Sequence, residues 1–229
     1  MEIRVLVPER YRATDGEIFS IVHDNPFALL ATNGDLTPFA THLPALIEPE
    51  PANLAAAERS LVGTTVLGHL NRSNPHWKRL QAGGSSTLVF QGPNAYVSPT
   101  VYQTTPAAPT WDFTVVHLRG EVVPFATTDE ALEVVRLTVR HLERVHSGSW
   151  DMTGSQDYFQ QLIPGVGAWR MHVTSVEGMV KLSQEQPGEV RQRVVTAFAD
   201  SPVDSHRTLA PLIASHGDPA ISVSARCPV

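Results

Sequence analysis

Residues 67–78 combine side chains that a planar cofactor with acidic arms would need. The segment reads Leu-Gly-His-Leu-Asn-Arg-Ser-Asn-Pro-His-Trp-Lys, with two imidazoles, two cations and an indole. A second segment, residues 88–99, adds an apolar strand, an amide-rich turn and the phenol of Tyr96. Imidazoles bind metals or exchange protons near neutral pH, and cations bind carboxylates and phosphates. We take these two segments as the candidate functional region.

Local patterns predict the elements that position the two histidines. Apolar and polar residues alternate from Val62 to Leu70, which predicts a strand that carries His69 near its end. Asn74-Pro75 is typical of an N-cap followed by proline in the first helical turn, so His76 is expected on a short helix. No Cys and no His-x3-His lies nearby, so this spacing does not predict a compact zinc motif.

Length and composition predict a single globular domain over residues 1–216 and a flexible tail over 217–229. The 229 residues are 42% hydrophobic, which is enough for a sizeable core. No apolar run approaches the roughly 20 residues that span a bilayer, and Met1 to Arg4 do not begin a signal peptide. We therefore expect a cytoplasmic protein without a membrane partner.

Charge and cysteine content exclude two further classes of protein. The net charge of −6 and the scattered basic residues argue against a nucleic-acid partner, which would require clustered Lys and Arg. The single cysteine, Cys227, lies near the chain end, so neither a disulfide framework nor a thiolate catalyst is predicted.

The remaining pattern predicts antiparallel strands joined by turns and interrupted by helices. Strands are expected over residues 27–32, 36–47, 86–90, 110–124 and 166–182, with another short one at Tyr96. Helices are expected over 15–24, 129–145, 156–163, 188–199 and 205–215, and residues 48–60 form an excursion without an assigned role. Neither G-x-G-x-x-G after a strand nor a P-loop occurs. The predicted fold class is α+β, an antiparallel split β-barrel with peripheral and C-terminal helices.

Five motifs in the same order resemble the PaiB family of FMN-binding proteins. They are Thr41-His-Leu-Pro44, Gly68–Trp77, Phe90–Pro99, Pro109-Thr-Trp-Asp-Phe113 and Lys181-Leu-Ser-Gln184. The resemblance runs from about Val7 to Val195. It implies a homodimeric FMN-binding split barrel with its cofactor between subunits.

The chain departs from the usual PaiB pattern over Thr100–Phe113, where that family tends to have a longer basic segment. This short neutral version, with Pro164–Trp169 and Ser205–Leu209, resembles the heme-dependent piperazate synthases. That resemblance implies heme b as cofactor, N5-hydroxy-L-ornithine as substrate and an N–N bond-forming cyclisation to L-piperazic acid in antibiotic and other natural-product pathways.

In that setting His69 is the first candidate for the iron ligand, and His76 is the second. The alternative for His69 is a hydrogen bond across the barrel. His42 and His117, in strand-like segments, are interpreted as structural.

The other candidates are cations and pocket-lining residues. Arg72, Lys78 and Lys181 could bind heme propionates or the substrate carboxylate, or could be solvated surface. Tyr96, Tyr102, Thr110 and Trp111 could line the pocket, with core packing as the alternative for Trp111. We assign catalytic roles to Lys78, Thr110 and Lys181, and cofactor binding to His69, Arg72, His76, Tyr96 and Trp111.

Two rival functions remain at this point. One is an FMN-binding PaiB-type transcriptional regulator, which the acidic balance and the lack of a recognisable helix-turn-helix disfavour. The other is a flavin reductase that binds FMN and oxidises a nicotinamide cofactor.

Overall fold

The computed structural model describes residues 6–48, 60–146 and 148–216. Most of the excursion predicted for residues 48–60, and the tail predicted for 217–229, lie outside the described residues. No described helix is long and apolar enough to cross a membrane.

The described strands form a closed barrel in the order β1-β2-β3-β6-β5-β4. The strands are β1 (Phe27–Thr32), β2 (Phe39–Ile47), β3 (Thr65–Asn71), β4 (Ser85–Val97), β5 (Thr110–Pro124) and β6 (Val166–Lys181). The pairs β1–β2, β1–β4, β2–β3 and β3–β6 are antiparallel. The predicted fold class, an antiparallel split barrel with added helices, is confirmed.

Seven α-helices and three short 3-10 helices accompany the strands within the described part of the chain. The α-helices are α1 (Asp15–Asp24), α2 (Pro75–Gln81), α3 (Pro99–Tyr102), α4 (Thr128–Val145), α5 (Gln156–Leu162), α6 (Gly188–Ala199) and α7 (Asp204–Ser215). The 3-10 helices are η1 (Glu9–Tyr11), η3 (Met152–Ser155) and η4 (Ile163–Gly165).

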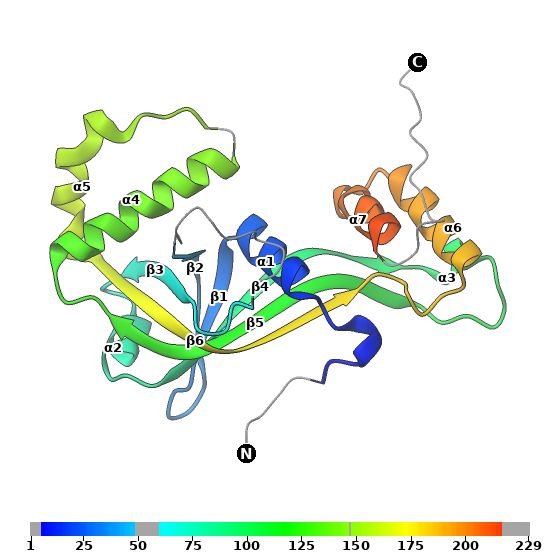
Figure 1. Ribbon diagram of the computed structural model, residues 1–229, viewed down its shortest axis with the longest axis horizontal. Helices are drawn as coiled ribbons and strands as arrows, with labels where there is room; N and C mark the ends of the chain where they lie inside the picture. The colour runs from blue at the N-terminus through cyan, green and yellow to red at the C-terminus, as the bar shows by residue number, and fades with distance from the viewer. Residues whose placement is uncertain (1–5, 49–59, 147, 217–229) are drawn as a thin grey trace. The chain divides into compact units, whose positions relative to one another are not determined.

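The chain forms two compact units, and β4, β5 and β6, the long ribbons of Figure 1, each pass from one to the other. The barrel unit comprises the described residues of 14–90 and 116–176, and therefore holds β1 to β3, α1, α2, α4 and α5. The terminal unit comprises residues 6–13, 91–115 and 177–216, and holds η1, α3, α6 and α7.

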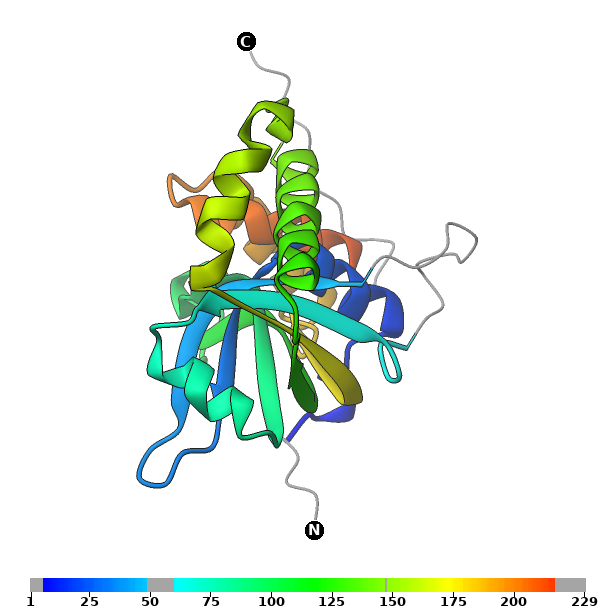
Figure 2. The same ribbon diagram turned by 90° about the vertical axis from the view of Figure 1, so that its left-hand side faces the viewer.

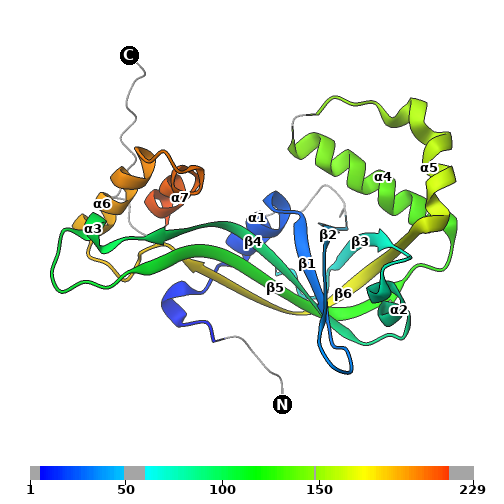
Figure 3. The same cartoon turned by 180° about the vertical axis from the view of Figure 1, so that it is seen from behind.

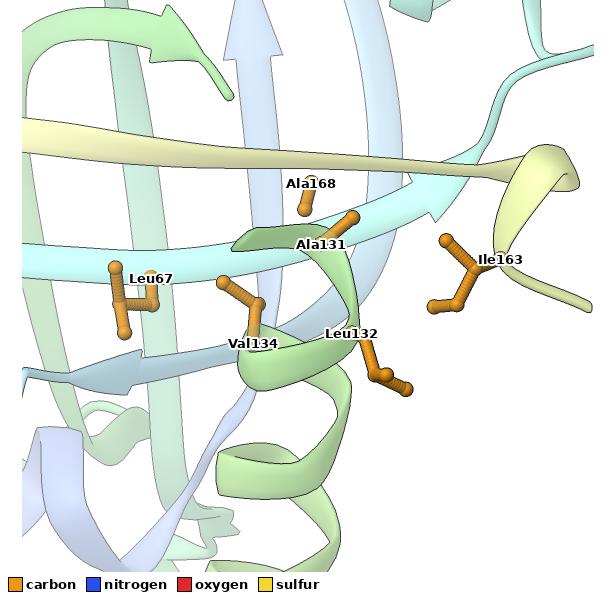
Figure 4. Close-up of a cluster of buried hydrophobic side chains, with 6 residues drawn as sticks. All are labelled: Leu67, Ala131, Leu132, Val134, Ile163 and Ala168. Carbon is orange, nitrogen blue, oxygen red and sulfur yellow. The ribbon is translucent and has the colours of Figure 1, made fainter. Parts of the chain in front are cut away.

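In the barrel unit, α4 and α5 lie beside the β3–β6 side of the barrel (Figure 2). The apolar residues that connect α4 and η4 to these strands are Leu67, Ala131, Leu132, Val134, Ile163 and Ala168 (Figure 4). Thr127 caps α4 through a capping box with Glu130, so the helix begins at Thr128, one residue before the predicted start at residue 129. Each fully buried Leu or Val adds about 1.5–3 kcal/mol, so this contact holds α4 and η4 against β3 and β6.

In the terminal unit, α3, α6 and α7 gather over the ends of β4 and β5 (Figure 3). Helix α6 contacts both α3 and α7. Its buried face includes Val190, Val194 and Phe198, which lie at helical spacing. This apolar layer holds α3, which carries Tyr102, next to the strand ends.

Strand β4 is continuous, so the break predicted between residues 90 and 96 is wrong. Proline cannot donate to a strand ladder, so Gly92-Pro93 would interrupt a strand at a position paired through its N–H. However, β1 pairs with β4 only over Ser86–Val89, so Pro93 lies beyond that register and interrupts no bond to β1.

Candidate functional site

His69 lies on β3 in the barrel unit, opposite Ala168 of β6. The adjacent pair, Gly68 and Trp169, shows why glycine precedes it: a Cβ at Gly68 would lie 2.2 Å from Cζ2 of Trp169. Burial lowers the pKa of the half-buried His69, so its imidazole is neutral at pH 7. Its Nδ1 is enclosed and has no hydrogen-bond partner among the described residues. Nδ1 therefore does not make the hydrogen bond across the barrel that was the alternative role for His69.

His76 is arranged differently, although it lies in the same motif. It is 1% exposed on α2, with Nδ1 2.9 Å from Thr41 Oγ1 and Nε2 2.9 Å from Thr32 Oγ1. The ring also stacks on Phe39, with centroids 5.4 Å apart. Because both ring nitrogens are engaged inside the barrel unit, this geometry favours a structural role for His76.

Arg72 and Lys78 are exposed cations that flank the start of α2. The Arg72 Nε donates to the carbonyl of Val166 (2.8 Å), and its guanidinium lies 5.7 Å from the ring centre of Trp77. Trp77 packs so closely on β6 that a Cβ at Gly167 would lie 2.5 Å from its ring. These contacts hold the Arg72 side chain at the surface, three residues after His69 in the sequence. An exposed guanidinium can bind an anion.

Lys181, at the end of β6, forms the centre of a polar cluster in the terminal unit. Its ammonium donates to Thr110 Oγ1 and to the carbonyl of Trp111 (3.1 Å), and lies 3.6 Å from Glu185 Oε1. The Tyr11 hydroxyl donates to Glu185 Oε2 at 3.3 Å. The predicted residues Thr110 and Lys181 are therefore in direct contact.

Asp112 lies beside this cluster and is fully buried, at 0% exposure. Oδ1 accepts the backbone N–H of Ser183 (3.1 Å), and Oδ2 accepts the Ser183 hydroxyl (2.6 Å). Burial raises the pKa of Asp112 to about 6, although the bonds from Ser183 and the charge of Lys181 oppose this rise. A buried carboxyl that titrates near pH 6 is unusual, and shifted pKa values of this kind are common at functional sites.

Tyr102 also belongs to the terminal unit and is 2% exposed. Burial raises the pKa of its hydroxyl to about 12, and that hydroxyl has no hydrogen-bond partner among the described residues. Tyr102 is therefore a neutral phenol in the fold, and not a surface residue that lines an open pocket.

Trp111 and Tyr96 lie on exposed surface of the terminal unit. Trp111 is 50% exposed, so the alternative of core packing is wrong. Its Nε1 donates to Asn94 Oδ1 (3.2 Å), and its ring centre is 6.1 Å from that of Tyr96. A hollow of about 230 Å³ is lined here by Gln91, Asn94, Trp111, Phe113, Thr114 and Val115. Because ligand pockets usually have about 300–1,000 Å³, this hollow alone would hold only part of a cofactor.

Comparison with known proteins identifies the family. Residues 6–175 match the family model described as "Putative FMN-binding domain". The chain belongs to this FMN-binding family. It is 26% identical over 183 residues to Protease synthase and sporulation protein PAI 2 of Bacillus subtilis, which covers 79% of this chain and 82% of that protein. The predicted resemblance to PaiB-type proteins is confirmed.

Solved structures show the same fold at low identity. A conserved hypothetical protein of Mycobacterium tuberculosis, Rv2991, aligns with TM-score 0.54 and 12% identity, over 80% of this chain and 94% of its own. An FAD and heme binding protein of Mycobacterium smegmatis aligns with TM-score 0.52 and 12% identity, over 80% and 78%. These similarities support the split-barrel fold of the FMN-binding family.

The predicted site residues thus fall into two groups. His69, Arg72, His76 and Lys78 belong to the barrel unit, whereas Tyr96, Thr110, Trp111 and Lys181 belong to the terminal unit. Among the described residues, no group of three or more His, Cys, Asp or Glu side chains could hold a metal ion.

Four residues in or beside the Lys181 cluster were not predicted as site residues: Tyr11, Asp112, Ser183 and Glu185. Asp112 stands two residues from Thr110 on a strand, which places both side chains on one face. That spacing was a usable signal. The contacts of Ser183 and Glu185 depend on a turn after β6 whose conformation has no clear sequence pattern.

Proposed function

We propose that this protein is a heme-dependent piperazate synthase. The reaction closes N5-hydroxy-L-ornithine to L-piperazic acid: a bond forms between the α-amine nitrogen and N5, and the N5–O bond breaks. The α-amine gives up one proton, and the hydroxyl leaves as water, so there is no net oxidation or reduction. Bound heme would supply an iron centre that polarises the N–O bond.

The observation that supports heme is the state of His69. Iron requires a neutral imidazole that is not used elsewhere in the fold, whereas a flavin requires no such ligand. Burial keeps His69 neutral, and Nδ1 is enclosed, which leaves Nε2 as the nitrogen that could meet iron. One feature differs from most metal-bound histidines, since Nδ1 meets no acceptor among the described residues.

The exposed cations in the same motif fit the acidic groups of this reaction. The guanidinium of Arg72 can pair with a carboxylate in two hydrogen bonds, and the ammonium of Lys78 acts as a point charge. Both are exposed, so a heme propionate or the substrate carboxylate could reach them. Tyr96 and Trp111 offer ring faces for stacking.

Thr110 and Lys181 fit the departure of water. Thr110 Oγ1 accepts a hydrogen bond from the Lys181 ammonium, so its own proton is directed elsewhere and can be donated. In the proposed reaction Thr110 donates that proton to the leaving hydroxyl, and Lys181 replaces it. The α-amine proton then restores Lys181.

The family match supports an alternative, FMN as the bound cofactor. Binding of FMN in place of heme would make the protein a PaiB-type regulator or a flavin reductase. Absorption spectra distinguish the two cofactors directly.

The test is a titration of the purified protein with hemin, with FMN added to a parallel sample. We expect a sharp Soret band that saturates at one heme per chain, and the loss of this band in His69→Ala. His42→Ala is the matched control, because His42 is an exposed barrel-unit histidine that stacks on Phe27. Stoichiometric FMN with no Soret band, or full heme uptake by His69→Ala, would overturn the assignment.

A further inference from the structure

Strand β5 contacts the turn after β6 through two side chains in matching register. Thr110 and Asp112 are two residues apart on β5 and face the same side, away from the exposed Trp111. Thr110 contacts Lys181, and Asp112 contacts Ser183. Ser183 lies two residues after Lys181, so the two contacts have the same spacing on both segments. All four residues belong to the terminal unit.

The Asp112 contact uses both carboxyl oxygens on one residue. Ser183 donates its N–H to Oδ1 and its hydroxyl to Oδ2. Two bonds from one residue fix both the position and the rotation of the acceptor, and charge-assisted bonds of this kind are about twice as strong as neutral ones. Ser183 itself is 0% exposed, so in the folded chain its hydroxyl and the Asp112 carboxylate are enclosed together.

The turn needs this support because its backbone is strained. Ser183 has φ +58°, in the left-handed region, which costs a residue other than glycine roughly 1–2 kcal/mol. Without the Asp112 bonds, the turn would relax toward ordinary backbone angles.

The strained turn determines where Glu185 lies. It brings this carboxylate back to 3.6 Å from the Lys181 ammonium as an ion pair, while the ammonium donates hydrogen bonds to Thr110 and to the Trp111 carbonyl. A change at Ser183 would move Glu185 and release Lys181 from Thr110.

We propose that Asp112 is a positioning residue: by clamping Ser183, it holds the Lys181 ammonium on the Thr110 hydroxyl. This inference rests on the proposed function, in which Thr110 and Lys181 move the proton. Asp112 itself touches neither substrate nor cofactor in this scheme.

The charge environment of Asp112 agrees with this role. Its pKa of about 6, raised by burial, makes the carboxylate the main form at neutral pH, when the clamp is strongest. The ionisable groups around it are Lys181 and Glu185 of the turn region, Tyr102 of α3 and Tyr11 of η1. Of these, Lys181 favours the ionised form and Glu185 opposes it.

The experiment compares Asp112→Asn and Ser183→Ala with Asp204→Asn, an exposed acid of α7 that pairs with Arg207. The first measurement is amide hydrogen exchange over residues 181–185, which needs no activity. We expect roughly tenfold faster exchange or more in both clamp variants and no change in the control. Unchanged protection in Asp112→Asn and Ser183→Ala would overturn the clamp.

The second measurement is turnover of the heme-loaded proteins across pH 5–8. We expect kcat of Asp112→Asn to fall roughly tenfold or more, with little change in KM or in the Soret band, because proton transfer and not binding is affected. The wild-type profile should lose activity below about pH 6, and the variant should not show this step. Equal kcat in wild type and Asp112→Asn would overturn the positioning role. If heme-loaded wild type makes no product, the proposed function fails, and hydrogen exchange alone decides the clamp.

Discussion

At the scale of single residues, the protonation of Asp112 should be visible in stability. Burial raises its pKa from 3.8 to about 6, whereas the unfolded chain keeps the ordinary value. Between pH 3.8 and about 6 the folded state holds a proton on Asp112 that the unfolded chain has released. The stability that Asp112 adds is therefore complete below about pH 4 and is lost as pH rises through 6. We expect the free energy of unfolding to lose on the order of 2–3 kcal/mol from this group between pH 4 and 7.

Urea denaturation at several pH values measures this effect. The useful quantity is wild type minus Asp112→Asn, since other titrating groups cancel in the difference. A difference that is constant, or that grows in favour of wild type as pH rises, would contradict the raised pKa.

Residue types alone could not separate His69 from His76. Both lie in one motif, and both are histidines on predicted elements, as the structure confirms for β3 and α2. Their roles diverge because Thr32 and Thr41 of other strands occupy both nitrogens of His76. Such partners, 35 and 44 residues away, depend on the barrel topology, which a local pattern does not contain.

At the scale of elements, the contact between β5 and β6 depends on Gly120. A Cβ there would lie 2.0 Å from the carbonyl oxygen of His172, which is backbone and cannot turn aside. We expect Gly120→Ala to destabilise the protein by about 1–3 kcal/mol, as measured by the midpoint of urea unfolding. Gly154→Ala is the control because nothing lies within 4 Å of its Cβ. Equal midpoints for the two variants would show that the strands can separate to accept the methyl group.

The limits of prediction also differ between elements. Helix α1 and strand β1 have the predicted bounds, because a Thr14 cap and an Asn33-Gly34 turn mark them locally. The sequence predicts an amide-rich turn where the structure has a continuous β4, and Gly92-Pro93 fits both a turn and a strand segment that is not paired with β1. Pairing with distant strands decides that case.

At the scale of the whole molecule, we expect a homodimer, as the PaiB-type resemblance implies. Tyr96 and Trp111 are large exposed side chains of the kind that is enriched in protein interfaces. Sedimentation equilibrium at micromolar concentration should give twice the mass of one chain. A single-chain mass that persists after heme is added would contradict the dimer.

We propose that His69 and heme together serve piperazate formation. The most direct measurement is product analysis by mass spectrometry after N5-hydroxy-L-ornithine is incubated with heme-loaded wild type, FMN-treated wild type and the two histidine variants. We expect L-piperazic acid, one water lighter than the substrate, from heme-loaded wild type and His42→Ala, and none from His69→Ala or the FMN sample. No product from heme-loaded wild type, or equal product from His69→Ala, would contradict this role of His69 and heme.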